Sequence, residues 1–163
     1  MASSMQAQEL AALCYDDVQV GDRWTSPART VTETDIVNFA CLSGDFNPLH
    51  VDYEFAKNTM FGKPIAHGLV VLSISTGLTN AWPRMRTVAF LSIREWHFRK
   101  PVFAGDTVHV VTEVVDKESR GRGRRGSITW RRQIINQAGD VVQEGMTQTL
   151  VEMRDAGSEQ AGQ

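Results

Sequence analysis

The sequence predicts an α+β fold in which a curved antiparallel sheet wraps around one long helix. The segment 68–78 is almost wholly apolar and carries no charge, as expected for a helix that is buried on most sides. Four long segments rich in valine, isoleucine, threonine and aromatic residues follow it, as expected for strands. Short, turn-rich connections join these strands, which favours antiparallel neighbours. A sheet curled around the helix covers both elements.

The part of the chain before this helix is predicted to be mixed. Residues 21–31 suggest an opening strand. Thr32 to Asp35 resembles a capping box, in which Thr32 accepts hydrogen bonds from the first N–H groups of a helix. Turn-forming residues at 43–48 end this helix, and residues 52–60 suggest a second short helix. Four apolar residues at helical spacing are predicted to form the buried stripe of the first helix: Ile36, Val37, Ala40 and Cys41.

The strands of the second half are predicted at 86–99, 107–117, 127–136 and 141–152. In the third of them, apolar residues alternate with polar ones, which is typical of a sheet with one buried face. The buried set is Ile128, Trp130 and Ile134, and the exposed set is Thr129, Arg131 and Gln133.

The chain is expected to form one domain. It has 163 residues, enough to bury a core without disulfide or metal staples. Its ends are polar and rich in small residues, so we expect an N-terminal arm at 1–17, a domain at 18–152 and a flexible tail at 153–163.

Composition favours a cytoplasmic protein. The formal net charge of −2 gives no general reason to expect nucleic acid or membrane as a partner. Cys14 and Cys41 do not make a disulfide framework and fit a reducing compartment. We find neither a signal peptide nor the ~20 apolar residues that cross a bilayer.

The segment 45–52 carries the strongest candidate for chemistry. It contains Asp45 and His50, and Pro48 between them stiffens the loop. A carboxylate and an imidazole held at a fixed separation can share one water and move its protons near neutral pH. The alternative is structural: an Asp that caps a turn, and a His with satisfied polar contacts.

A second candidate lies at the start of the apolar helix. Gly68 allows a ligand to approach the backbone closely. Free N–H groups at a helix start, with the positive end of the helix dipole, favour a developing oxyanion. Taken alone, a glycine before a helix more often marks only a turn.

Taken together, three motifs resemble those of the MaoC-like family of (R)-specific enoyl-CoA hydratases. They are DFNPLH at 45–50, GKPIAHG at 62–68 and FRKPVFAGD at 98–106. The resemblance runs from about Val18 to Glu152. It implies a hot-dog fold, a homodimer made by pairing two sheets, and reversible hydration of a 2-enoyl thioester to a 3-hydroxyacyl thioester.

The resemblance also implies roles for single residues. Asp45 and His50 match the catalytic pair that positions and activates water, and the N–H of Gly68 matches the group that holds the thioester carbonyl. Three further residues match substrate-binding positions: Asn47, which orients the loop or His50; His67; and Thr76, where relatives have serine. No metal or redox cofactor is implied, and coenzyme A or phosphopantetheine belongs to the substrate.

Two other functions remain open at this point. A thioesterase of the same fold would hydrolyse the acyl–sulfur bond, and a non-catalytic subunit would only bind the acyl thioester. A cluster of arginines is predicted to contact the phosphates of coenzyme A or of an acyl carrier protein's prosthetic arm. The alternative is a solvated hairpin tip, and nucleic-acid binding is weaker still. The cluster is Arg120, Arg122, Arg124 and Arg125.

Overall fold

The computed structural model describes residues 12–80, 82–120 and 124–154. The described strands form one antiparallel sheet in the order β1-β4-β5-β6-β3, and β2 also pairs with β4. The elements are η1 (Tyr15–Asp17), β1 (Arg23–Thr25), β2 (Arg29–Thr30), α2 (Glu33–Ser43), α3 (Pro48–Val51), α4 (Tyr53–Lys57), α5 (Gly68–Asn80), β3 (Thr87–Phe98), β4 (Thr107–Arg120), β5 (Arg125–Asn136) and β6 (Val141–Glu152).

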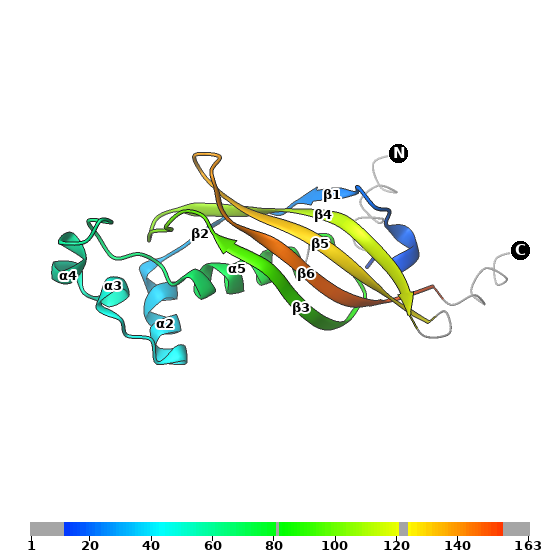
Figure 1. Ribbon diagram of the computed structural model, residues 1–163, viewed down its shortest axis with the longest axis horizontal. Helices are drawn as coiled ribbons and strands as arrows, with labels where there is room; N and C mark the ends of the chain where they lie inside the picture. Colours follow the sequence, from blue (N-terminus) through cyan, green and yellow to red (C-terminus); the bar gives the residue numbers. More distant parts are fainter. Residues whose placement is uncertain (1–11, 81, 121–123, 155–163) are drawn as a thin grey trace, which may run out of the picture.

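Helix α5 lies along the concave face of the sheet (Figure 1). One face of α5 is buried against the sheet, and its buried residues are Val70, Val71, Leu72, Ile74, Ser75 and Thr79. This confirms the predicted hot-dog arrangement of a long helix wrapped by an antiparallel sheet. No helix in the described ranges is long and apolar enough to cross a membrane.

Two separate groups of buried apolar residues make up the core. The larger one joins α5 to the part of the sheet near α2, and it contains Val31, Ile36, Ala66, Val70, Val71, Ile74, Val102, Val108, Val110, Ile134 and Val142. The smaller one lies toward the other end of the sheet, and it contains Val18, Val114, Ile128, Trp130 and Val151.

The predicted opening strand at 21–31 is wrong as one element, because it is broken into β1 and β2. Pro27 has no N–H to donate, and residues 26–28 belong to neither strand. The Ser26 hydroxyl accepts a hydrogen bond from the Val110 N–H at 2.9 Å, while the Ser26 N–H donates to the Val110 carbonyl at 2.9 Å. At the break, one of the two hydrogen bonds to Val110 is thus a backbone bond and the other is made by a side chain.

Helix α2 confirms the predicted capping box but corrects its buried stripe. Thr32 Oγ1 accepts from the Asp35 N–H at 3.2 Å, and Asp35 Oδ2 accepts from the Thr32 N–H at 2.8 Å. Ile36 and Ala40 are buried, whereas Val37 is 48% exposed and Cys41 is also exposed. The reason is position: α2, α3 and α4 project beyond the sheet (Figure 1), so one side of α2 is covered.

Two further segments differ in detail from the prediction. The short helix predicted at 52–60 is confined to α4, and α3 was not predicted as a helix. Residues from the predicted N-terminal arm contact the sheet end: the Leu13 N–H donates to the Arg84 carbonyl at 2.8 Å, and the Arg86 N–H donates to the Leu13 carbonyl at 2.8 Å. Cys14 beside them is buried.

Candidate active site

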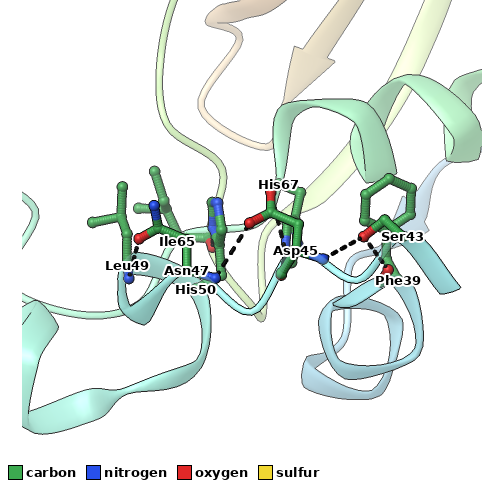
Figure 2. A network of polar contacts seen from close by, with 8 residues as sticks. All are labelled: Phe39, Ser43, Asp45, Asn47, Leu49, His50, Ile65 and His67. Carbon is green, nitrogen blue, oxygen red and sulfur yellow. Dashed lines mark hydrogen bonds and ion pairs between the residues drawn. The ribbon is translucent and has the colours of Figure 1, made fainter. Parts of the chain in front are cut away.

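The loop that carries Asp45 begins where α2 ends. Gly44 closes the helix at φ 76°, a left-handed conformation that glycine adopts without strain. Its N–H donates to the Ala40 carbonyl at 2.9 Å. The Ser43 hydroxyl then accepts from the Asp45 N–H at 3.2 Å. The end of α2 therefore fixes the point from which Asp45 projects (Figure 2).

Asn47 connects Asp45 to the short helix that holds His50. The Asn47 N–H donates to Asp45 Oδ1 at 3.2 Å, and Asn47 Oδ1 accepts from the Leu49 N–H at 3.0 Å, capping α3. Pro48 occupies the first turn of α3, where its missing N–H has no consequence. The Asp45 side chain is 52% exposed, so its second oxygen, Oδ2, is accessible to water.

The imidazole of His50 is held in one tautomer. Its Nδ1 lies 2.7 Å from the Ile65 carbonyl oxygen. A carbonyl can only accept a hydrogen bond, so Nδ1 carries the proton and Nε2 keeps its lone pair. The half-buried His50 ring therefore presents a basic nitrogen.

His67 joins the two predicted motifs. Its side chain is 3% exposed, and Nε2 donates to the Asp45 carbonyl oxygen at 2.9 Å. Its ring stacks on that of His50, with centroids 3.8 Å apart and planes at 28°. The His67 ring also contacts the Phe39 ring, and the two ring centroids lie 5.1 Å apart. His67 therefore fixes Asp45 through the backbone and His50 through the ring (Figure 2).

The three polar side chains also meet a distance criterion for metal ligands. One ligand atom from each of Asp45, His50 and His67 lies within 4.8 Å of the others. However, His67 Nε2 donates to a carbonyl, and His67 Nδ1 is buried without a partner among the described residues. Ring nitrogens coordinate in the ring plane, and two stacked rings do not direct their lone pairs to one point. This geometry suits proton transfer better than shared metal coordination.

Gly68 begins α5 next to His67. The N–H groups of Gly68 and Leu69 have no acceptor within the described part of the chain, as expected for the first turn of a helix. They point out at the positive end of the α5 dipole. A Cβ on Gly68 would lie 2.5 Å from a ring carbon of Phe98, so a larger residue does not fit here without moving that ring.

A cavity of about 530 Å³ opens beside Gly68. Most of its walls are apolar, and they include Phe61, Ile65, Leu69, Phe98 and Val102. His50 borders a different, smaller cavity of about 130 Å³ between α2 and α4. The wall beside Gly68 thus suits a largely apolar ligand, with polar groups at its edge.

Not all predicted site residues come together. Thr76 lies eight residues beyond Gly68 on α5, about 12 Å along the helix, and its hydroxyl donates to the Ser73 carbonyl at 2.7 Å. Arg124 and Arg125 are exposed at the end of the sheet opposite to α2–α4 (Figure 1). Their position does not support contact with the phosphates of a thioester substrate held at Asp45 of the same chain. Arg122 and the side chain of Arg120 lie outside the described residues.

Two contributors to the site were missed from the sequence. The Ile65 carbonyl orients His50, but a backbone carbonyl leaves no mark in the residue pattern. Gln143 donates from Nε2 to the Gly68 carbonyl at 2.9 Å and so anchors the start of α5 to β6. Gln143 is 2% exposed. The signal that could have identified it is a polar residue at a position of the predicted strand that faces the core.

Comparison with known proteins supports the resemblance. The family model described as "MaoC like domain" matches residues 18–133. The (R)-specific enoyl-CoA hydratase of Rhodospirillum rubrum is 33% identical over 153 residues, which cover 92% of this chain and 99% of the relative. Protein MaoC of Klebsiella aerogenes is 38% identical over 96 residues, covering 59% of this chain and 29% of that longer protein.

A solved structure agrees with the fold. The monoamine oxidase regulatory protein of Archaeoglobus fulgius superposes with a TM-score of 0.80 at 37% sequence identity, covering 88% of this chain and 97% of that one. The family model spans more than half of the sequence, and the Rhodospirillum relative spans nearly all of it. The chain therefore belongs to the MaoC-like domain family.

Proposed function

We propose that this chain catalyses the reversible addition of water to the double bond of a 2-enoyl thioester, giving a 3-hydroxyacyl thioester. One observation carries the proposal: His67 bonds the Asp45 carbonyl and stacks on the His50 ring, and it directly precedes Gly68 at the start of α5. Relatives named as (R)-specific enoyl-CoA hydratase and 3-hydroxybutyryl-CoA dehydratase support this reaction class.

Proton transfer is assigned to the Asp45–His50 pair. Asp45 Oδ2 accepts a hydrogen bond from a water, and His50 Nε2 removes the other proton of that water as its oxygen attacks the β-carbon. The carbon–carbon π electrons move toward the thioester carbonyl. His50 then gives the same proton to the α-carbon, so that one water is added in total. Asp45 stabilises the imidazolium that forms in between.

We assign stabilisation of the negative charge that develops on the thioester oxygen to the start of α5. The N–H of Gly68 and the helix dipole meet this oxygen, and a contact of this kind is worth about 3–4 kcal/mol in a transition state. Coenzyme A, or the phosphopantetheine arm of an acyl carrier protein, takes part as the carrier of the acyl group. This scheme requires no metal and no redox cofactor.

The thioesterase and the non-catalytic binder are separated by one experiment. Purified protein is mixed with crotonyl-CoA while enoyl absorbance and free thiol are both followed. We expect absorbance to fall without thiol release. Thiol release in step with turnover would instead identify a thioesterase, and the absence of both, for crotonyl-CoA and longer enoyl-CoA esters, would favour a binding subunit.

We further propose that the protein is a homodimer. Among the described strands, β3 forms one edge of the sheet and β1 lies at the other. Apolar side chains are exposed along β3, including Val88, Leu91 and Ile93. Exposed edges and apolar patches of this kind are normally covered by a partner. Pairing of two such edges would cover both copies at once.

A further inference from the structure

A band of polar residues crosses the concave face of the sheet between the two apolar clusters. On β4, Thr112 lies between Val110 and Val114, which belong to different clusters. Arg132 of β5 pairs with Thr112 in the register of the sheet. The side chain of Arg132 faces α5, where its Nη1 donates to Thr79 Oγ1 at 2.5 Å. Polar side chains, one of them charged, therefore lie in the middle of the core.

Arg132 is a buried cation without a counter-ion. It is 8% exposed, and its Nε has no hydrogen-bond partner among the described residues. No carboxylate within the described ranges forms an ion pair with it. Burial lowers the pKa of the guanidinium to about 10, so it stays charged at neutral pH. An unpaired charge in this position opposes folding.

Two hydroxyl groups near Arg132 resemble its Nε, because they too are buried without a hydrogen-bond partner among the described residues. Oγ1 of Thr112 and Oγ1 of Thr147 are both buried without a hydrogen-bond partner in the described part of the chain. Thr112 pairs with Arg132 on one side, and Thr147 is two residues from Gly145, which pairs with Arg132 on the other. Buried polar groups are normally satisfied, so several unsatisfied donors in one place indicate a ligand.

Two of these residues, Arg132 and Thr112, border a cavity of about 430 Å³, a volume within the usual range for small-ligand pockets. Arg132, Thr79 and Thr112 form polar parts of its wall, while Met85, Phe90 and Trp130 form apolar parts. The pocket is therefore suited to a ligand that has an apolar body and one anionic end.

We propose that this pocket binds a carboxylate at the far end of the acyl group, so that the substrate is a thioester of a dicarboxylic acid. A guanidinium pairs with a planar carboxylate through two parallel hydrogen bonds. One cation matches one negative charge, whereas a phosphate dianion would leave charge uncompensated. This inference rests on the proposed function, because it assigns the pocket to the acyl part of the same substrate.

Helix α5 relates the pocket to the proposed reaction site. Gly68 stands at its start and Thr79 lies eleven residues later on the same face, about 16 Å along the axis. An acyl chain that leaves the thioester at Gly68 and follows α5 brings its far end toward Arg132. The apolar side chains of the pocket then contact its methylene groups.

The binding test uses saturated thioesters, which cannot be hydrated. Calorimetry compares dodecanedioyl-, tetradecanedioyl- and hexadecanedioyl-CoA, whose acyl chains can span the ~16 Å from Gly68 to Thr79, with dodecanoyl-, tetradecanoyl- and hexadecanoyl-CoA, pair by pair. We expect at least one dicarboxylic thioester to bind roughly a hundredfold more tightly than its methyl-ended match. Equal or weaker binding of every dicarboxylic thioester would overturn the proposal.

Two variants separate recognition from structure. Arg132→Met removes the charge but keeps an apolar chain, so we expect the preference to disappear and the thermal midpoint to stay the same or rise. Arg131→Met is the matched control, because Arg131 is exposed on the opposite face, and it should keep the preference. A large fall in the midpoint of Arg132→Met, together with an unchanged preference, would make Arg132 a structural residue.

Turnover and free anions distinguish the remaining possibilities. The matching 2-enoyl thioesters should show the same preference in kcat/KM. If wild type binds dicarboxylic thioesters selectively but hydrates none of them, the proposed reaction fails while the pocket assignment stands. If free adipate protects wild type but not Arg132→Met from thermal unfolding, and no thioester is preferred, the ligand is a separate carboxylate and the substrate assignment is wrong.

Discussion

Replacing His67 with phenylalanine tests whether this buried ring positions the reacting pair. The change keeps an aromatic ring beside His50 but removes the hydrogen bond from Nε2 to the Asp45 carbonyl. A displacement of about 1 Å in a reacting group can lower the rate about a hundredfold. At about 1.36 kcal/mol per factor of ten, this is about 2.7 kcal/mol of transition-state stabilisation.

The effect of the same variant on stability should be small. The lost hydrogen bond is worth about 1 kcal/mol, but the variant also removes the buried, unpartnered Nδ1, whose burial costs about 1–3 kcal/mol. These contributions oppose each other. For a domain of this size, a net change of about 1 kcal/mol shifts the thermal midpoint by about 2–4 °C.

The assay is steady-state hydration of crotonyl-CoA, or of a better enoyl-CoA substrate, together with the thermal midpoint. We expect kcat to fall about a hundredfold with KM nearly unchanged. The control is His97→Phe, since His97 is exposed on β3, and its kcat should match that of wild type. A His67→Phe protein with wild-type kcat would refute the positioning role.

Three further predictions concern α5, α2 and the sheet edge. Gly68→Ala should lower kcat, because its Cβ would meet the Phe98 ring at 2.5 Å, and Phe98→Ala in the same protein should restore part of the loss. Gly77→Ala, which meets no atom within 4 Å, should instead raise the thermal midpoint through helix propensity. Burial alone would raise the pKa of Asp35, but hydrogen bonds from Thr32 and the charge of Arg29 lower this pKa overall. The ionised carboxylate therefore stabilises the fold, and Asp35→Asn should lower the free energy of unfolding at neutral pH. This loss of stability relative to wild type should shrink below about pH 4, where Asp35 takes up a proton. Ile93→Lys on the β3 edge should give a monomer by sedimentation, and an unchanged dimer would place the interface elsewhere.

The elements that were predictable have strong local patterns. The segment at 68–78 is apolar because one face of α5 is buried, although Leu69 and Thr76 are exposed. In β5 the predicted alternation holds from Trp130 to Ile134, but Thr129, predicted to be exposed, is buried. The capping box at Thr32 is a local motif, so it could be read directly. The pairing of Asp45 with His50 was predicted from a stiff loop of six residues.

What could not be predicted depends on contacts that are distant in sequence. Val37 and Cys41 have the spacing of a buried stripe, but α2 projects past the sheet and leaves them exposed. His50 is oriented by the carbonyl of Ile65, which lies 15 residues away. Arg132 did leave a signal that was missed: it shares the parity of Trp130 and Ile134, so a charged residue stands at a buried position of β5.

Measuring Asp45→Asn, His50→Gln and the double variant tests the proposed reaction most directly. Each single change should lower kcat for enoyl-CoA hydration by about 10²–10⁴, with the thermal midpoint nearly unchanged because both side chains lie at the surface of the site. If both groups act on one water, the kcat of the double variant should be only slightly lower than that of the less active single variant. Near-normal turnover in either single variant, or losses that multiply fully in the double variant, would contradict the assignment of one water to this pair.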